Sequence, residues 1–136
     1  MNEELESLLV SGREIDKKLV HEILSPFLRI DKETCDIRPL SSWSDLRAKT
    51  RILLYLIARK AMVALGLPLA EERASATEIM QKTGMRKGTV NPALRSLLED
   101  DRLLEQSEDR KYHVPNYAIE RVRAIIGEEQ VNQART

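Results

Sequence analysis

A short stretch near the middle of the chain decides the fold: residues 75–98 read SATEIMQKTGMRKGTVNPALRSLL. Ser75 and Glu78 have the spacing of a capping box, in which the hydroxyl accepts from a free backbone N–H and the carboxylate reaches back. Gly84 supplies the left-handed residue that ends such a helix. Apolar residues then recur at offsets of four, seven and eight from Val90, which is one side of a second helix. The stretch therefore predicts two short helices joined by a tight turn.

Pro92 determines where the second helix can begin. A helix that started at Arg86 or Lys87 would hold the proline in its interior, where the ring strikes the carbonyl four residues back at a cost of roughly 3 kcal/mol. With Thr89 as the cap, Pro92 falls on the third helical position, where no intrahelical hydrogen bond is lost. We therefore expect the helix to start after Thr89.

The same stretch carries a family resemblance. Residues 84–90, GMRKGTV, are similar to the turn and the start of the recognition helix in helix-turn-helix proteins, and DRLL at 101–104 with KYHV at 111–114 look like the two strands of a wing. Together, residues 48–126 resemble a winged helix-turn-helix domain, the commonest DNA-binding module of prokaryotic transcription regulators. Winged helices also serve as protein-docking domains, so the pattern is more specific for fold than for function.

Periodicity and turn residues outline the rest of the chain. They predict helices over 2–11, 14–24, 45–66 (capped by Ser44), 76–83, 90–100 and 116–126 (stopped by Gly127), a hairpin over 27–38 and a wing over 103–114. We expect a mainly α fold with a small β wing. The expected organisation is an N-terminal extension (1–43) that dimerises or covers the long helix, a winged helix-turn-helix domain (44–127) and a frayed polar tail (128–136).

Composition bounds the function classes. The net charge is zero, but residues 1–43 carry six Lys and Arg against nine Asp and Glu, whereas residues 44–127 carry fifteen against eleven. A domain of +4 beside an extension of −3 is compatible with nucleic acid. The single cysteine, Cys35, excludes an internal disulfide, and no apolar run reaches the roughly 18 residues that span a membrane. With acidic residues at the start instead of a secretory signal, we expect a cytoplasmic protein.

Catalytic patterns are scarce. The chain has two histidines and one cysteine, with no phosphate-cradling glycine loop and no metal-ligand spacing. We therefore expect no enzyme activity, no cofactor and no metal site.

The DNA-binding residues implied by the resemblance lie on the recognition helix, its approach and the wing. They are Arg86, Lys87, Thr89, Asn91, Arg95, Arg110 and Lys111. Arg86 and Lys87 suit the phosphate backbone, while Asn91 and Arg95 suit base edges in the major groove. The expected function is sequence-specific binding of double-stranded DNA in transcription regulation. The alternative is a winged-helix protein-interaction module that binds no nucleic acid, and the acidic residues 108 and 109 at the wing tip favour it.

The long helix also bears on assembly. Residues 52–58 read ILLYLIA, so the helix is apolar on all sides and must be covered on all sides. We expect a homodimer in which the N-terminal extension and this helix meet a second copy, with Leu5, Leu8 and Leu9 adding apolar surface. The competing account folds residues 14–43 over the same helix and leaves a monomer.

Overall fold

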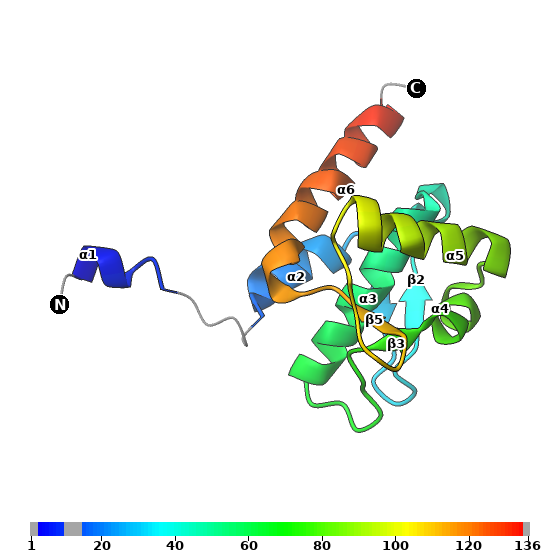
Figure 1. The fold of residues 1–136 in the computed structure, drawn as a ribbon, viewed down its shortest axis with the longest axis horizontal. Helices are drawn as coiled ribbons and strands as arrows, with labels where there is room; N and C mark the ends of the chain where they lie inside the picture. The colour runs from blue at the N-terminus through cyan, green and yellow to red at the C-terminus, as the bar shows by residue number, and fades with distance from the viewer. Residues whose placement is uncertain (1–2, 10–14, 135–136) are drawn as a thin grey trace.

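Helix α3 (Ala48–Ala64) runs through the centre of the protein, and the elements that follow the first helix pack around it (Figure 1). The computed structural model describes residues 3–9 and 15–134. The helices are α1 (Glu3–Glu6), α2 (Lys17–Leu24), α3, α4 (Ala76–Thr83), α5 (Lys87–Arg95) and α6 (Ile119–Ala134), with 3-10 turns η1 (Ser41–Asp45) and η3 (Asn116–Ala118) and a π-helical turn η2 (Ser96–Asp100). The strands are β1 (Leu28–Ile30), β2 (Ile37–Pro39), β3 (Ala74–Ser75), β4 (Glu105–Gln106) and β5 (Lys111–His113). The fold is mainly helical with small antiparallel sheets, as the sequence predicts.

The apolar run of α3 is covered within the chain itself. Residues 52–58 are all 1% exposed or less. Helices α2, α4, α5 and α6 and strand β5 all contact α3, and one hydrophobic core contains side chains from the extension and from the helices that follow it. Burying α3 therefore requires no second copy of the chain. Helix α2, from the N-terminal extension, packs on α3, as expected if the extension folds over this helix.

Both predicted hairpins are present. Strands β1 and β2 pair with Ile30 opposite Ile37, and the Asp31 carboxylate closes their turn by accepting from the backbone N–H of Glu33 and Thr34 at 2.9 and 3.1 Å. Strands β4 and β5 form the predicted hairpin before the last helix. Leu103 and Leu104 were expected in the first strand of this hairpin, but β4 begins only at Glu105. Both leucine side chains are buried in the core, whereas successive side chains of a strand point to opposite faces.

Strand β3 was not predicted. Ala74 pairs with Tyr112 and Ser75 with Lys111, which makes a three-stranded sheet in the order β3-β5-β4. A strand of two residues is too short to show the alternation of apolar and polar residues by which strands are recognised, so the sequence pattern contains no signal for it. Its role is to tie the start of α4 to the hairpin.

The predicted start of the long helix is wrong. The segment from Ser41 to Asp45 is a 3-10 turn, in which the Ser44 hydroxyl donates to the Ser41 carbonyl at 3.1 Å and so caps nothing. Helix α3 begins at Ala48 after Arg47, whose side chain makes no cap bond. Glu129 on α6 contacts this helix start, as the backbone N–H of Arg47 donates to its Oε1 at 2.6 Å.

The predicted start of the second short helix is also wrong. Helix α5 begins at Lys87, and the N–H groups of Thr89 and Val90 both donate to the Arg86 carbonyl, at 3.0 and 2.9 Å. Pro92 therefore lies inside the helix. The following turn η2 is wound more loosely, with the Asp101 N–H donating to the Ser96 carbonyl at 2.9 Å.

The predicted end of the last helix is wrong as well. Helix α6 continues through Gly127 to Ala134, so residues 128–134 are helical and not a frayed tail. Gly127 does not adopt the left-handed conformation that ends α4 at Gly84 (φ 73°). The burial of Ile126 and Glu129 on either side of it holds this part of α6 against the core.

The N-terminal helices are shorter than predicted. Helix α1 spans only Glu3–Glu6 of the expected 2–11, of which residues 2, 10 and 11 lie outside the described part. Helix α2 begins at Lys17, since the Asp16 carboxylate accepts from the Leu19 N–H at 3.1 Å and caps it there. Residue 14 of the expected 14–24 helix, and the last two residues of the chain, also lie outside the described part.

Candidate nucleic-acid interface

The candidate interface is built on the pair α4 and α5. The capping box opens α4 as predicted: the Glu78 N–H donates to the Ser75 hydroxyl at 3.1 Å, and the Ser75 N–H donates to the Glu78 carboxylate at 3.3 Å. Gly84 closes the helix, and its N–H donates to the Met80 carbonyl at 2.9 Å. Only three residues, 84–86, then separate α4 from α5, and the two helices pack against each other.

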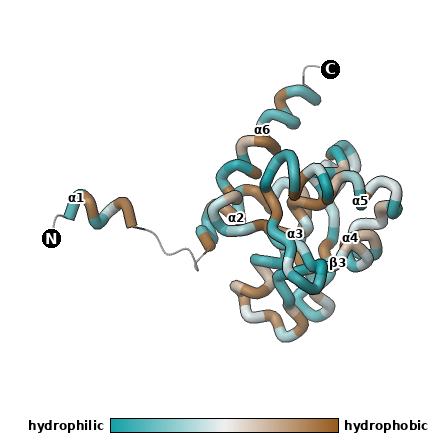
Figure 2. Tube along the Cα trace, in the orientation of Figure 1, coloured by the Kyte–Doolittle hydropathy of each residue, from teal (hydrophilic) through white to brown (hydrophobic). Residues whose placement is uncertain are grey.

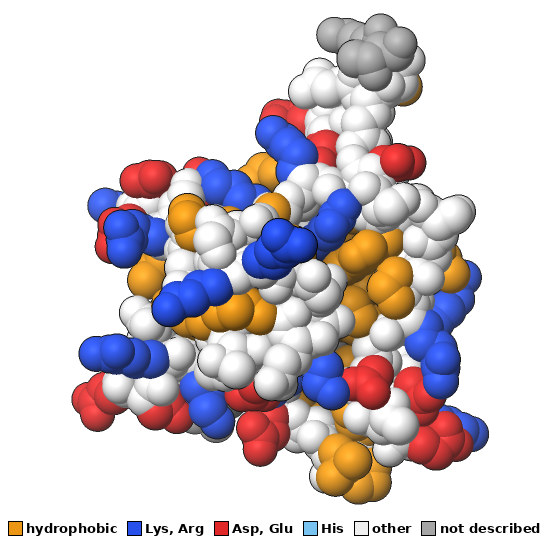
Figure 3. All heavy atoms as spheres, turned by 90° about the vertical axis from the view of Figure 1, so that its right-hand side faces the viewer, with side chains coloured by type: hydrophobic (Ala, Val, Ile, Leu, Met, Phe, Trp, Pro, Cys, Tyr) orange, Lys and Arg blue, Asp and Glu red, His pale blue; other side chains and the backbone are white. Residues whose placement is uncertain are grey.

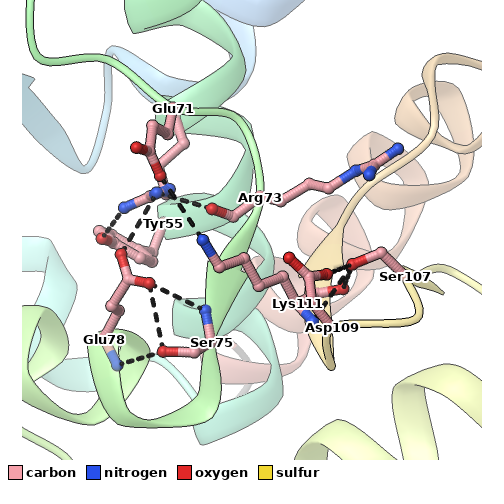
Figure 4. Close-up of polar contacts among 9 residues, drawn as sticks. Tyr55, Glu71, Arg73, Ser75, Glu78, Ser107, Asp109 and Lys111 are labelled. Carbon is pink, nitrogen blue, oxygen red and sulfur yellow. Dashed lines mark hydrogen bonds and ion pairs between the residues drawn. The ribbon is translucent and has the colours of Figure 1, made fainter.

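A buried arginine anchors α4 to the central helix. Arg59 of α3 donates to the Tyr55 hydroxyl at 2.9 Å and to the Arg73 carbonyl at 2.7 Å, and its guanidinium lies 3.4 Å from Glu78 (Figure 4). Burial raises the pKa of Tyr55, so its hydroxyl stays protonated and accepts from the guanidinium. Glu78 thus serves both the capping box and the ion pair with α3.

Helix α5 presents one polar side to solvent. Its inner side is fixed by Val90 and Leu94, both buried against the core. Lys87, Asn91 and Arg95 follow one another at intervals of four residues and are all exposed, so they form one stripe along the outer side. We call these three residues the α5 stripe.

The predicted residues at the approach to α5 lie beside this stripe. Arg86 and Thr89 are exposed at the first turn of the helix. Within residues 3–9 and 15–134, the side chains of Arg86, Lys87 and Arg95 make no ion pair or hydrogen bond. Three guanidinium and ammonium groups at one helix therefore remain available to an anionic partner.

The β4–β5 hairpin, which the sequence predicts as a wing, supplies fewer unpaired cations than predicted. Arg110 is exposed with a left-handed backbone (φ 61°), but the Lys111 ammonium lies 3.8 Å from Glu71 and is directed to the loop before β3 (Figure 4). A hydrogen bond from the Ser107 hydroxyl lowers the pKa of Asp109, so this carboxylate is ionised at the tip. Of the two wing residues in the predicted set, Arg110 is the one that stays unpaired among the described residues.

Ion pairs that the sequence pattern did not reveal surround the interface. Lys82 on α4 lies 2.5 Å from Asp36 of the first hairpin, and this contact raises the pKa of the lysine and lowers that of the aspartate. At the other end of α5, Lys49 pairs with Asp101 at 2.9 Å. These contacts join residues 46 and 52 positions apart, so no local pattern could indicate them.

The surface around the helix pair is locally basic. Figure 3 looks onto the side of the molecule that carries α4 and α5, and a diagonal band of Lys and Arg side chains crosses it, with acidic side chains toward the margins. The chain as a whole has no net charge. The basic side chains on this side are therefore balanced by acidic side chains elsewhere on the chain.

Other classes of site find little support in the structure. No group of three or more His, Cys, Asp and Glu among the described residues could hold a metal ion. Nor is any described helix long and apolar enough to cross a bilayer. Comparison with models of known protein families, with curated proteins and with solved structures gave no match. What supports a function is the geometry of the chain itself.

Proposed function

We propose that the chain binds double-stranded DNA as a winged helix-turn-helix protein, with α5 in the major groove, and that it regulates transcription. The observation that carries the proposal is the α5 stripe: Lys87, Asn91 and Arg95 are exposed on one side of a helix whose other side is buried. An α-helix fits the major groove, where Arg pairs with guanine and Asn with adenine.

The surrounding elements support the same function. Two helices joined by a three-residue turn are followed by a two-stranded hairpin, as in the family that residues 48–126 resemble. The side chain of Arg86 makes no cap bond, so free N–H groups of the first turn of α5 add to the positive charge of Arg86 and Lys87. Such a helix start favours a phosphate. Arg110 extends the contact toward the neighbouring backbone.

The test is an anisotropy titration of the full chain with a short labelled duplex of random sequence at several salt concentrations. If Arg86, Lys87 and Arg110 each neutralise one phosphate, the affinity should fall roughly 40-fold between about 50 and 200 mM salt. Lys87→Ala should weaken binding to all sequences and make the salt slope shallower by about one. Lys18→Ala is the matched control, because this exposed lysine lies on α2, away from α5.

Arg95 separates base contacts from backbone contacts. Once a preferred duplex has been selected from random sequence, Arg95→Ala should cost about 1–3 kcal/mol on that duplex and should relax the preference for it. Equal losses on preferred and random duplexes would make Arg95 a backbone contact.

A protein-docking module is the second candidate, and the exposed acidic residues Glu99 and Asp100 beyond the α5 stripe favour it. Like charges there repel phosphate. Absence of salt-dependent binding to any duplex, in a sample whose circular dichroism shows a folded helical protein, would reject DNA binding in favour of docking.

A further inference from the structure

An apolar groove lies on the side of α3 that carries α2. It has a volume of about 370 Å³, at the lower end of the ~300–1,000 Å³ typical of ligand pockets. Apolar side chains from α2, β1 and the end of α3 line it, among them Val20, Leu24, Leu28, Ala61, Ala64 and Leu65. Lys17, His21 and Arg29 also belong to its lining, so the apolar surface is bordered by basic groups.

A second apolar surface lies on the N-terminal segment, residues 3–9. Leu5, Leu8 and Leu9 are 63%, 75% and 78% exposed. The N–H of Leu8 donates to the Leu5 carbonyl at 3.1 Å, so the helical turn continues past α1 and the three leucines, spaced i, i+3 and i+4, lie on one side. Figure 2 shows hydrophobic residues at α1 and also at the loop after α3, on the periphery of the molecule.

The two surfaces are complementary in charge. The N-terminal segment carries Glu3, Glu4 and Glu6 and no basic residue among positions 3–9. The groove presents Lys17 and Arg29, and within residues 3–9 and 15–134 no acidic residue lines it. A short amphipathic helix that lays its leucines into an apolar groove, with its carboxylates against basic groups at the edge, is a recurring mode of recognition.

We propose that the groove binds the N-terminal segment of a second copy of this chain, with each copy giving its segment and receiving the other's. Helix α1 stands well away from the body of its own chain, with its leucines in solvent (Figure 1). Ile15, where the described chain resumes, lies in the groove lining. Each segment therefore leaves from beside its own groove, and two grooves that face each other across a two-fold axis exchange segments over a short distance.

This assembly is compatible with the proposed interface and does not depend on it. Helices α2 and α5 lie on opposite sides of α3, so a dimer that closes over the groove leaves the α5 stripe exposed (Figure 1). The test needs no DNA, and its result is independent of whether DNA binds.

The experiment measures the mass of the full chain by sedimentation over a range of concentrations. The wild type should show twice the mass of one chain at high concentration and dissociate on dilution. Leu8→Glu in the segment and Ala64→Glu in the groove should each give one-chain masses. Both positions are exposed, so the fold should survive, which circular dichroism checks. Leu69→Glu is the control, since Leu69 is equally exposed but does not line the groove.

Mixing the two defective variants distinguishes exchange from docking within one chain. The Ala64→Glu copy has an intact segment and the Leu8→Glu copy has an intact groove, so the mixture should recover a heterodimer with one segment–groove contact. A one-chain mass for the wild type at every concentration would overturn the proposal. So would dimers that persist in both variants or a mixture that stays monomeric. If Ala64→Glu unfolds, Leu65→Glu tests the groove instead, because Leu65 is 68% exposed.

Discussion

Pro92 is the residue whose position departs most from what its chemistry favours. It lies inside α5, where its ring removes the hydrogen bond to the Gly88 carbonyl and crowds it. Proline in a helix interior costs roughly 3 kcal/mol of stability relative to alanine. About 0.4–1 kcal/mol of this is offset, because proline reduces the conformational entropy of the unfolded chain.

Pro92→Ala should therefore raise the free energy of unfolding by about 1–2 kcal/mol. This is less than the full cost of a proline in a helix, because small shifts of the backbone around Pro92 relieve part of the clash. Urea unfolding measures this change. Asn91→Ala on the neighbouring exposed position serves as the control and should gain no more than about 0.7 kcal/mol from helix propensity. A loss of stability in Pro92→Ala would mean that the ring makes favourable contacts that outweigh the missing bond.

His113 makes the stability of the fold depend on pH. Burial lowers the pKa of this histidine, and its Nε2 lies 3.2 Å from Glu105 while Nδ1 is buried without a hydrogen-bond partner among the described residues. An unfolded histidine titrates near pH 6.5. As the pH falls below that value, the unfolded chain takes up a proton that the folded chain does not, and the free energy of unfolding decreases.

Replacing His113 by Gln should flatten this decrease between about pH 7 and 5, measured by urea unfolding at a series of pH values. Identical slopes for wild type and His113→Gln would show that this histidine takes up its proton equally in both states.

Single residues show where sequence reasoning succeeds. The capping box of Ser75 and Glu78 and the left-handed Gly84 were predicted correctly, because each depends on atoms within a few residues. Thr89 and Gly127 were predicted wrongly. In both places a local cost, a proline or a glycine inside a helix, is about 1–3 kcal/mol and is outweighed by burial of the apolar residues beside it.

At the scale of elements, α6 holds the start of α3. Glu129 is 3% exposed, and its two carboxylate oxygens accept from the Arg47 N–H at 2.6 Å and from the Thr50 hydroxyl at 2.5 Å. The carboxylate thereby ties the N-cap residue and the first turn of α3 to α6, and its negative charge lies at the positive end of the helix dipole.

Glu129→Ala should lower the free energy of unfolding by about 2–3 kcal/mol, since two donors lose a charged acceptor. Glu128→Ala, one residue away and exposed, should change it by less than about 0.5 kcal/mol. Thermal and urea unfolding of the two variants give the comparison, and equal stabilities would mean that water satisfies these two donors as well as Glu129 does.

This contact also shows why elements were harder to predict than caps. Arg47 and Glu129 are 82 positions apart, so nothing near Ser44 indicated that the start of α3 would be held by α6. The apolar run of α3 correctly predicted a helix buried on all sides, yet it could not say that α2 of the same chain would supply the cover. Strand β3 is too short to carry a period.

At the scale of the whole molecule, the charges sum to zero, while basic residues gather locally at two places. The α5 stripe with Arg86 lies on one side, and the groove lies on the side of α2. The sequence indicated Asn91 and Arg95 because helical spacing places them together, whereas Lys87 was expected in the turn before the helix. It did not indicate that Lys111 would pair with Glu71, which depends on the register of β3 and β5.

The most direct test of the proposed function is to map the amides of the full chain, 15.6 kDa, by NMR while a short duplex of random sequence is added. We predict that the largest shift changes fall on Arg86, Lys87, Asn91 and Arg95, with smaller ones at Arg110. Amides of α2 should not change, because the groove side does not meet DNA. Shifts that centre on α2, or a spectrum that duplex leaves unaltered at low salt, would contradict the account.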